Sequence, residues 1–441
     1  MMHPAVQTLY RRDSAAIAGI EKLRFFPLAI VSGRGCWLTE AGGRPLLDLS
    51  ASWAANGLGH GHPAIVEAVS TAIKAAPGAS CLSAVHPGMV DLAETLLDLV
   101  PGEADRSVYV GLTGTDANEA AVAACRHGTG RRRVIAFAGG YHGGFGIAKQ
   151  LSGVHIDAGG EADRDLALAR YPTLYRAGAV ASPGEDIVGA SLREIRSFLQ
   201  HGNVACVIVE PILSDGGMIV PPLGFLAALH REARTHGALL ICDEVKVGLG
   251  RTGLLHAFQR DGVVPDLVTF GKSLGGGLPI SALVGPRRLL AEPGASAMLT
   301  LAGNPVSVAA ARAVLHTLIA EDLPVRAAGA GARLRAGLAQ ALDGVAEVGD
   351  IRGAGLALGI ELVTAGECIG ANAALARHVA YRAWELGAVF FYVGGNVLEL
   401  TPPLIISDAE IDQAIEIVNR AIRDSLAGLV DVSEVDRFAG W

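Results

Sequence analysis

Short apolar segments alternate with segments of helical pattern between about residues 70 and 320, and this alternation constrains the fold most. The apolar runs, such as VACVIV at 204–209 and ALLIC at 238–242, end in a charged residue after five or six positions. Such short runs are typical of strands buried on both faces, whereas a membrane-spanning helix needs roughly 20 apolar residues. The alternation therefore predicts an α/β fold with a mostly parallel, doubly wound sheet.

The expected elements also predict how the chain divides into domains. Six strands are expected in the sheet, at 106–112, 133–138, 205–210, 238–245, 267–272 and 281–285. Helical patterns lie between them, for example at 116–128 and 222–237. After a helix at 304–321, the sequence predicts a helix, a strand at 351–362, another helix, the run AVFFYV at 388–393 and a closing helix at 408–427. We expect a large domain over 70–320 and a smaller α+β domain formed by 1–69 and 321–441.

Composition and short motifs argue against several classes of protein. The 441 residues carry a net charge of -8 and no long basic run, so neither nucleic acid nor a membrane is an expected partner. The N-terminal segment lacks the apolar stretch of a secretory signal. His60 and His62 form a His-x-His pair without a suitably spaced third ligand, so no metal site is expected. The scattered cysteines predict reduced thiols in a cytoplasmic enzyme; they are Cys36, Cys81, Cys125, Cys206, Cys242 and Cys368.

Charged residues stand at the ends of three expected strands. Glu210, Asp243 and Lys272 hold these positions, and ligands of open α/β sheets bind beyond the carboxyl ends of strands. Burial would make a lysine there a usable nucleophile. Pyridoxal 5′-phosphate (PLP) needs such a lysine for its Schiff base and an acid that keeps its pyridine nitrogen protonated. The alternatives are a surface lysine and an aspartate in a structural ion pair.

A phosphate site is expected at the start of the helix in GLTGTDANEAAVAACR. Gly114 and Thr115 lie between a strand and a helix that begins near Asp116. Backbone N–H groups at a helix N-terminus favour an anion, although a simple capping turn would look the same.

The stretch GLGRTG has the spacing of a dinucleotide-binding fingerprint, with Gly248, Gly250 and Gly253. That fingerprint should open a helix and be followed by an acid about 20 residues later. Here only some ten residues separate it from Pro265, so we interpret these glycines as turn residues.

Six segments together resemble the class III, fold-type I PLP-dependent enzymes, the family of ω-aminotransferases. They are GTDANEAA, GGYHGG, VEPILSDGGMIVPP, ICDEVKVGLGRTG, FGKSLGGGLP and TLAGNP. The resemblance covers almost the whole chain. It implies the fold-type I PLP-dependent transferase fold and a small-molecule amine substrate. It also implies a homodimer, or a dimer of dimers, with active sites shared between subunits.

The resemblance also implies the roles of individual residues. Lys272 would carry the cofactor as a Schiff base, and Asp243 would hold the pyridine nitrogen. Val245 and Tyr141 would pack on the two faces of the ring. The remaining implied roles are phosphate binding by Gly114, Thr115 and Thr300 of the partner subunit, support of the ring or its aspartate by His142, and orientation of neighbouring groups by Glu210.

Two departures from the aminotransferase pattern point to a smaller group. Lys246 stands where aminotransferases of this class have glutamine, near the phenolic oxygen of the cofactor. Glu399 stands where they commonly have an arginine that binds the substrate carboxylate. With LYRRDSAAIAGIEKLRFFPLAI near the N-terminus and the terminal FAGW, these departures most closely resemble the α-amino-ε-caprolactam racemases, which also racemise α-amino acid amides. Leu213, where that group has glutamine, is a local difference.

The racemase resemblance implies two acid/base groups on opposite faces of the substrate Cα. Lys272 would remove the proton from one face. Asp215 would return a proton to the other, with Tyr141 as the competing candidate. The structural alternative for Asp215 is an acid that caps the SDGG turn. The alternative activity is that of a class III ω-aminotransferase, which requires a keto acid as acceptor.

Overall fold

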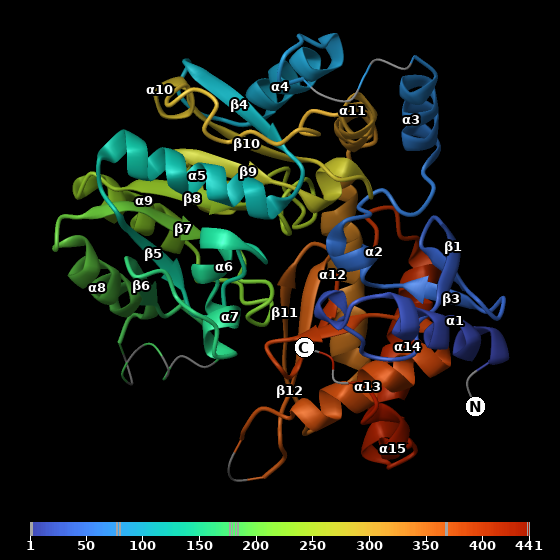
Figure 1. Cartoon of the computed structure of the whole chain (residues 1–441). Coiled ribbons are helices and arrows are strands. Elements are labelled where there is room, and N and C mark those ends of the chain that lie inside the picture. Colours follow the sequence, from blue (N-terminus) through green and yellow to red (C-terminus); the bar gives the residue numbers. More distant parts are fainter. Residues whose placement is uncertain are drawn as a thin grey trace. The chain divides into compact units, whose positions relative to one another are not determined.

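The computed structural model divides into two compact units (Figure 1). It describes the chain except residues 1–2, 76–77, 79–80, 176–177, 179, 181, 183–184, 367–368, 439 and 441. The large unit is Pro63–Pro324, and the small unit consists of Met1–His62 and Val325–Trp441. Cys368 and two residues of FAGW, 439 and 441, lie outside the described residues.

The large unit is built on a seven-stranded sheet with the order β4-β10-β9-β8-β7-β5-β6. The strands are β4 (Arg106–Gly111), β5 (Arg133–Phe137), β6 (Leu166–Ala169), β7 (Val204–Val209), β8 (Leu239–Asp243), β9 (Leu267–Phe270) and β10 (Ser281–Pro286). Neighbours from β6 to β9 pair in parallel, and β10 runs antiparallel to both β4 and β9. The predicted mostly parallel α/β sheet is confirmed. Sequence reasoning missed β6, a four-residue strand that is only half buried.

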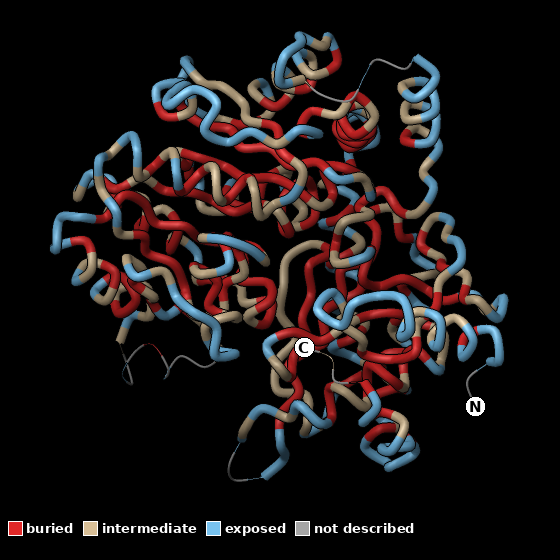
Figure 2. Tube along the Cα trace, viewed as in Figure 1, coloured by how far each residue is buried: buried red, intermediate tan, exposed pale blue. Residues whose placement is uncertain are grey.

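Helices connect the strands of the large unit. They are α3 (Pro63–Ala75), α4 (Pro87–Leu99), α5 (Gly114–Thr129), α6 (Gly146–Gln150), α7 (Gly153–Asp157), α8 (Ile187–Leu199), α9 (Phe225–Thr235), α10 (Arg287–Leu290) and α11 (Pro305–Ala320), with 3-10 turns η3 (Ala257–Asp261) and η4 (Lys272–Gly275). Helix α5 packs on β4, β7, β9 and β10. Figure 2 shows the strands of this sheet buried along most of their length, and every residue of β7 is buried. Each fully buried valine or isoleucine side chain contributes roughly 1.5–3 kcal/mol to folding.

The small unit contains two four-stranded sheets, with orders β1-β2-β3-β13 and β11-β12-β15-β14. The strands are β1 (Ile30–Arg34), β2 (Trp37–Glu40), β3 (Pro45–Asp48), β11 (Val348–Ala354), β12 (Ala357–Leu362), β13 (Ala388–Val389), β14 (Phe391–Val393) and β15 (Val397–Leu400). The helices are α1 (Pro4–Ala16), η1 (Gly19–Glu21), α2 (Ala51–Ala54), α12 (Leu323–Ala341), which begins at the end of the large unit, α13 (Ala373–Leu386), α14 (Asp408–Leu426) and α15 (Val432–Val435).

Two expected strands of this unit are each divided in the structure. The segment 351–362 is a hairpin, because Gly355 at φ +53° turns the chain between β11 and β12. The run AVFFYV supplies β13 to one sheet and β14 to the other. The run AVFFYV contains no turn residue, so only the pairing could show its division. The segment 351–362 contains three glycines, a turn signal that sequence reasoning did not use. Across the described ranges, no helix combines the length and apolar character needed to cross a membrane.

Glu244 directly follows β8, and its carboxylate holds the start of η3. Its two oxygens accept hydrogen bonds from the backbone N–H groups of Ala257 (2.9 Å) and Phe258 (2.8 Å). The side chain is buried, and burial raises the pKa of Glu244 to about 7 despite these two donors. The second acid of the Asp243–Glu244 pair therefore stabilises the loop that follows β8.

The raised pKa of Glu244 predicts a pH-dependent stability. The folded protein binds this proton more tightly than the unfolded chain, whose glutamate pKa is about 4.3. The resulting stabilisation is complete below about pH 4.3 and is lost as the pH rises through about 7. We expect the unfolding free energy of the wild type, relative to Glu244→Gln, to fall by roughly 2–3 kcal/mol between pH 5 and 8. Chemical denaturation at several pH values measures this, with exposed Glu161→Gln as control; parallel curves for wild type and Glu244→Gln would contradict the expectation.

Candidate active site

Three adjacent strands bring the predicted charged residues to one edge of the sheet. Strands β7, β8 and β9 are neighbours. Glu210 follows β7, Asp243 is the last residue of β8, and Lys272 lies two residues after β9. Because these strands are parallel, their carboxyl ends meet at the same edge.

Asp243 is a buried carboxylate with three hydrogen-bond donors. Its Oδ2 accepts a bond from Asn118 Nδ2 (2.8 Å) and lies 2.8 Å from His142 Nδ1. Its Oδ1 accepts a bond from the backbone N–H of Val245 (3.1 Å). Because the carboxylate accepts, His142 carries its proton on Nδ1. A carboxylate oxygen has two lone pairs, so Oδ1 can accept one further donor, such as a pyridinium N–H.

Glu210 joins two loops around this carboxylate. Its Oε1 accepts the backbone N–H of Tyr141 (2.9 Å), and its Oε2 accepts the Ser214 hydroxyl (2.5 Å) and backbone N–H (3.2 Å). Burial raises the pKa of Glu210 to about 7, with Asp243 and Asp215 adding to the rise and His142 opposing it. A buried acid that contacts two loops in this way orients the residues on them.

The start of α5 provides a cradle with no room for a side chain. Thr113 caps the helix together with Asp116. A Cβ at Gly114 would lie 2.6 Å from a methyl carbon of Val245, and one at Gly271 would lie 3.2 Å from the backbone nitrogen of Gly114. The first N–H groups of an α-helix have no acceptor within the helix and favour an anion. Glycine therefore lets three backbone segments approach closely where a phosphate is expected.

Lys272 has an unusual backbone conformation. Its φ of +41° is rare for a residue with a Cβ, and such conformations cost about 1–3 kcal/mol and cluster at functional sites. Lys272 opens the turn η4 and is half-buried. Local strain thus coincides with the lysine that sequence reasoning selected.

Lys246 and Asp215 form a buried ion pair at this edge. Lys246 Nζ lies 2.7 Å from Asp215 Oδ1, and the two side chains are 4% and 8% exposed. Burial alone would raise the pKa of Asp215, but the Lys246 and Lys272 ammonium groups outweigh it and hold this pKa below its usual value. Asp215 is therefore ionised and lies within the electrostatic reach of Lys272.

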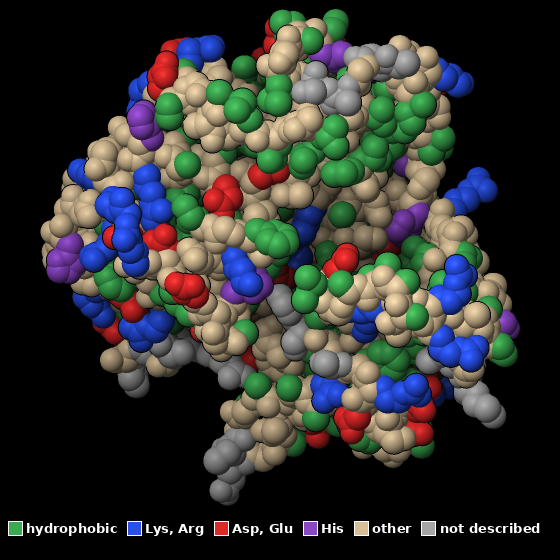
Figure 3. Space-filling model, viewed as in Figure 1, with side chains coloured by type: hydrophobic (Ala, Val, Ile, Leu, Met, Phe, Trp, Pro, Cys, Tyr) green, Lys and Arg blue, Asp and Glu red, His purple; other side chains and the backbone are tan. Residues whose placement is uncertain are grey.

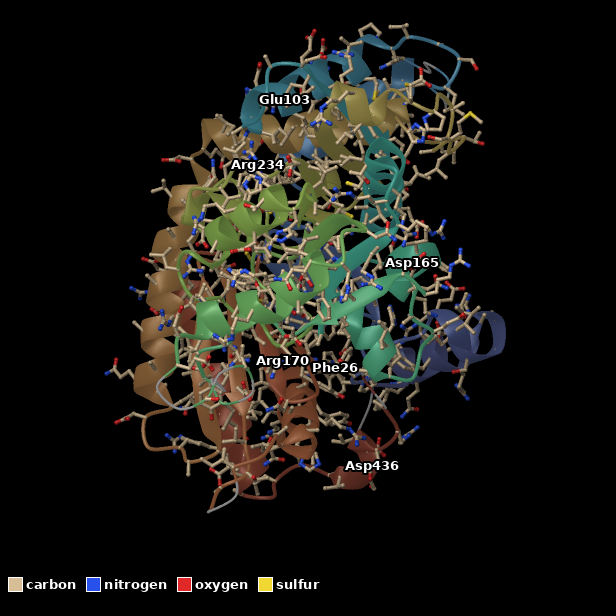
Figure 4. All side chains as sticks on the ribbon, turned by 90° about the vertical axis from the view of Figure 1, so that its left-hand side faces the viewer. Phe26, Glu103, Asp165, Arg170, Arg234 and Asp436 are labelled. Atoms are coloured by element: carbon tan, nitrogen blue, oxygen red, sulfur yellow. The ribbon has the colours of Figure 1, made fainter. Side chains whose placement is uncertain are left out.

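Surface ion pairs of the same unit provide a contrast. Arg170, labelled in Figure 4, lies 3.2 Å from Glu194, with side-chain exposures of 54% and 25%. Exposed pairs contribute about 0–1 kcal/mol, whereas a buried pair loses several kcal/mol of hydration per ion. Burial of the Lys246–Asp215 pair therefore costs hydration free energy, and a structural role alone does not account for it.

The charged groups of this edge act on the Tyr141 phenol. Burial raises the pKa of Tyr141, Asp215 raises it further, and Lys246 opposes both. The phenol is therefore protonated at neutral pH. Its ring centroid lies 5.4 Å from that of His155.

Thr300 and Glu399 lie on other elements. Thr300 is exposed on the segment that precedes α11. Glu399 is buried on β15 of the small unit, opposite Phe391, where the Thr401 hydroxyl lies 3.4 Å from its Oε1.

Sequence reasoning assigned no role to Asn118 and Ser214. Both lie within motifs that it did single out, GTDANEAA and VEPILSDGGMIVPP. Asn118 lies four residues after Gly114, hence on the same face of α5, and this spacing was the available signal. Ser214 directly precedes Asp215.

The residues of this edge fit PLP by the chemistry of their groups. Asp243 offers a buried acceptor for a pyridinium N–H, and Lys272 offers an amine. The cradle formed by Gly114 and Gly271 has no room for a Cβ, and the start of α5 offers backbone N–H groups to an anion. Val245 lies against that cradle with an apolar surface. A cation at Lys246 suits the phenolic oxygen of the ring.

Comparison with known proteins identifies the family of this chain. The family model for aminotransferase class III matches residues 20–422. An isoleucine 2-epimerase from Lentilactobacillus buchneri is 33% identical over 432 residues, 95% of each chain. An acetylornithine aminotransferase from Mycolicibacterium smegmatis is 37% identical and covers 88% of this chain and 91% of its own.

A crystal structure of an (S)-enantioselective omega-transaminase from Thermomicrobium roseum superimposes with a TM-score of 0.87 at 29% identity, over 96% of this chain and all of that one. A match of this extent includes both units and nearly every segment of the site. The chain belongs to the class III aminotransferase family of fold-type I enzymes, and its cofactor is pyridoxal 5′-phosphate.

Proposed function

We propose that this enzyme is a racemase that inverts the Cα of α-amino-ε-caprolactam and related α-amino acid amides. The buried Lys246–Asp215 pair near Lys272 carries this proposal. Inversion requires acid/base groups on both faces of Cα, and this pair supplies a second proton-transfer centre beside the lysine. The alternative is an ω-aminotransferase, which the 37% identity to an acetylornithine aminotransferase supports.

Bound PLP supplies the electron sink that acidifies the Cα–H of an attached amine. Asp243 would hold the pyridine nitrogen of this cofactor, and Glu210 keeps the loop of Tyr141 in place. Lys272 Nζ takes the Cα proton on one face. For inversion, a proton then reaches Cα from the other face rather than from Lys272.

Asp215 is our candidate for the opposite face, acting together with Lys246. An ionised Asp215 accepts a proton from Cα in one direction of the reaction. In the other direction it needs a proton source, and Lys246 Nζ lies 2.7 Å away. Tyr141 is the competing candidate, since its raised pKa keeps a proton on the phenol.

The presence of Glu399 favours a substrate that has no free carboxylate. A buried carboxylate in the register where relatives of this class bind a substrate carboxylate with arginine would repel that group. A lactam or amide is neutral there. The isoleucine 2-epimerase bears the name of a free amino acid, so the assay must include one.

We further propose a homodimer with shared active sites. Figure 3 shows hydrophobic side chains gathered on the face over α3 and α11. Val66 and Ile73 are exposed apolar residues of α3, and Met298 and Leu301 are exposed on the segment that precedes α11. Thr300 is exposed among them, which suits a residue that binds the cofactor phosphate of the partner subunit.

Deuterium exchange tests the proposed activity. The PLP-loaded enzyme is incubated in D₂O with L-α-amino-ε-caprolactam, L-alaninamide or L-isoleucine and no keto acid. We expect the first two to yield product of inverted configuration labelled at Cα, measured by chiral chromatography and mass spectrometry. Turnover that appears only after pyruvate or 2-oxoglutarate is added would identify an aminotransferase instead.

The Asp215→Asn variant tests the second acid/base group. We expect inversion to slow by about 10²–10⁴-fold, while Lys272 continues to exchange the Cα proton for deuterium with retained configuration. Tyr141→Phe is the matched variant, and it should invert within a few-fold of the wild type. The opposite pattern would assign the role to Tyr141.

Light scattering tests the dimer. We expect wild type to have about twice the mass of one 45.3 kDa chain. Ile73→Glu places a charge on α3 at a residue that is 60% exposed and should weaken association at low micromolar concentration. Val264→Glu, at an exposed valine of the large unit, is the control, and an unchanged dimer in both variants would place the interface elsewhere.

A further inference from the structure

Asn118 lies at the centre of a buried hydrogen-bond network that no sequence motif explained. It is 1% exposed and lies in the second turn of α5. Its Nδ2 donates to Asp243 Oδ2 and to the backbone carbonyl of His142, each at 2.8 Å. Its Oδ1 accepts the hydroxyl of Thr269 on β9, also at 2.8 Å. Both hydrogens of the amide and its oxygen are therefore used.

These contacts leave the amide a single orientation. A flipped amide would turn its oxygen toward the Asp243 carboxylate and the His142 carbonyl, and its NH₂ toward the Thr269 hydroxyl. The carboxylate and the carbonyl would then face the amide oxygen, which is also an acceptor, in the buried interior. This costs about 1–3 kcal/mol for each unsatisfied group. Thr269, fully buried on the strand beside β8, thus acts on Asp243 through the amide.

We propose that Asn118 is a positioning residue that aims the carboxylate of Asp243 at the pyridine nitrogen of PLP. The inference rests on the proposed role of Asp243. A hydrogen bond to a carboxylate is shorter and stronger than one between neutral groups, so it fixes the orientation of the carboxylate. The donors of Asn118 and His142 also occupy Oδ2, which leaves the free acceptor site of the carboxylate on Oδ1.

The same network couples the aspartate to the loop that carries Tyr141. Asn118 binds the carbonyl of His142, while the N–H of His142 donates to Ser152 Oγ (2.8 Å). His142 is therefore held at its backbone from both sides and at its ring by Asp243. Loss of the Asn118 amide would leave the His142 carbonyl, the Thr269 hydroxyl and one lone pair of Asp243 unpaired in the interior.

The affinity for PLP tests this role. It is measured by reconstitution of the apoenzyme, which is followed by the visible absorption and circular dichroism of the bound cofactor. Asn118→Leu keeps the approximate shape of the side chain and removes its polar groups. We expect about 10- to 100-fold weaker PLP binding, because hydrogen bonds to charged groups are worth that factor. Thr129→Val, which removes a 2.7 Å hydrogen bond at the far end of the same helix, should leave PLP affinity within twofold of wild type.

A milder pair of variants covers the case in which Asn118→Leu does not fold. Thr269→Val retains Asn118 but removes the hydroxyl that orients it, so we expect about 3- to 10-fold weaker PLP binding. Thr269→Ser restores the hydroxyl and should restore the affinity to within twofold. Equal affinities for Thr269→Val and Thr269→Ser, or an Asn118→Leu apoprotein that folds and binds PLP as well as Thr129→Val, would overturn the proposal.

The Asp243→Asn variant distinguishes an error in the role of Asn118 from an error in the role of Asp243. If Asp243→Asn binds PLP with wild-type affinity and spectrum, the role of Asp243 is wrong, and that of Asn118 falls with it. If Asp243→Asn weakens PLP binding but the Asn118 and Thr269 variants bind PLP as the wild type does, the role of Asp243 is supported. The positioning role of Asn118 is then overturned. Neither outcome depends on whether the enzyme is a racemase or an aminotransferase, since both bind the cofactor.

Discussion

The buried carboxylate of Asp243 is the interaction on which the site depends. An isolated carboxylate in an apolar interior is unstable by many kcal/mol unless it is paired and hydrogen-bonded. Here it receives donors from α5, from the 141–142 loop and from its own strand end. These donors come from segments far apart in the chain, so the carboxylate fixes their positions relative to each other. Residues that look unrelated in sequence thereby form one site.

The Lys246–Asp215 pair is a second set of buried charges at this edge of the sheet. Lys246 lies 2.7 Å from Asp215, and both side chains are almost fully buried, so the ammonium group helps to hold Asp215 ionised. Such a pair is often worth no more to stability than apolar residues of the same volume, but removing one partner is strongly destabilising. A gain in stability therefore does not explain its presence. We propose that the pair transfers protons beside Lys272, and this is why we connect it with inversion at Cα.

Neighbouring acids at this edge have different environments and different roles. Asp243 has donors on both oxygens, whereas Asp215 faces two ammonium groups. Glu210 and Glu244 accept backbone N–H groups of loops, and burial raises the pKa of each to about 7. The sequence presents Asp243 and Glu244 as an adjacent pair of like charge. In the structure one points to the cofactor site and the other to the start of η3.

The sequence by itself determined the class of fold and the kind of chemistry. Short apolar runs that end in charge specify parallel strands whose carboxyl ends meet, and the motifs around Lys272 and Asp243 specify a PLP enzyme. Those features are local in the chain, so periodicity and spacing reveal them. The strand pairing of 388–393 was not visible, because an apolar run does not show which sheet it joins. The turn in 351–362 did have a local signal, its glycines, which sequence reasoning did not use.

Only the tertiary structure decided how the charges are partnered. The Lys246–Asp215 contact spans 31 positions, and the contacts of Asp243 with Asn118 and His142 span 125 and 101. Burial and orientation at such separations depend on how helices and loops pack around the sheet. For the same reason, the roles of Asn118, Thr269 and Glu244 follow from hydrogen-bond geometry that no single segment encodes.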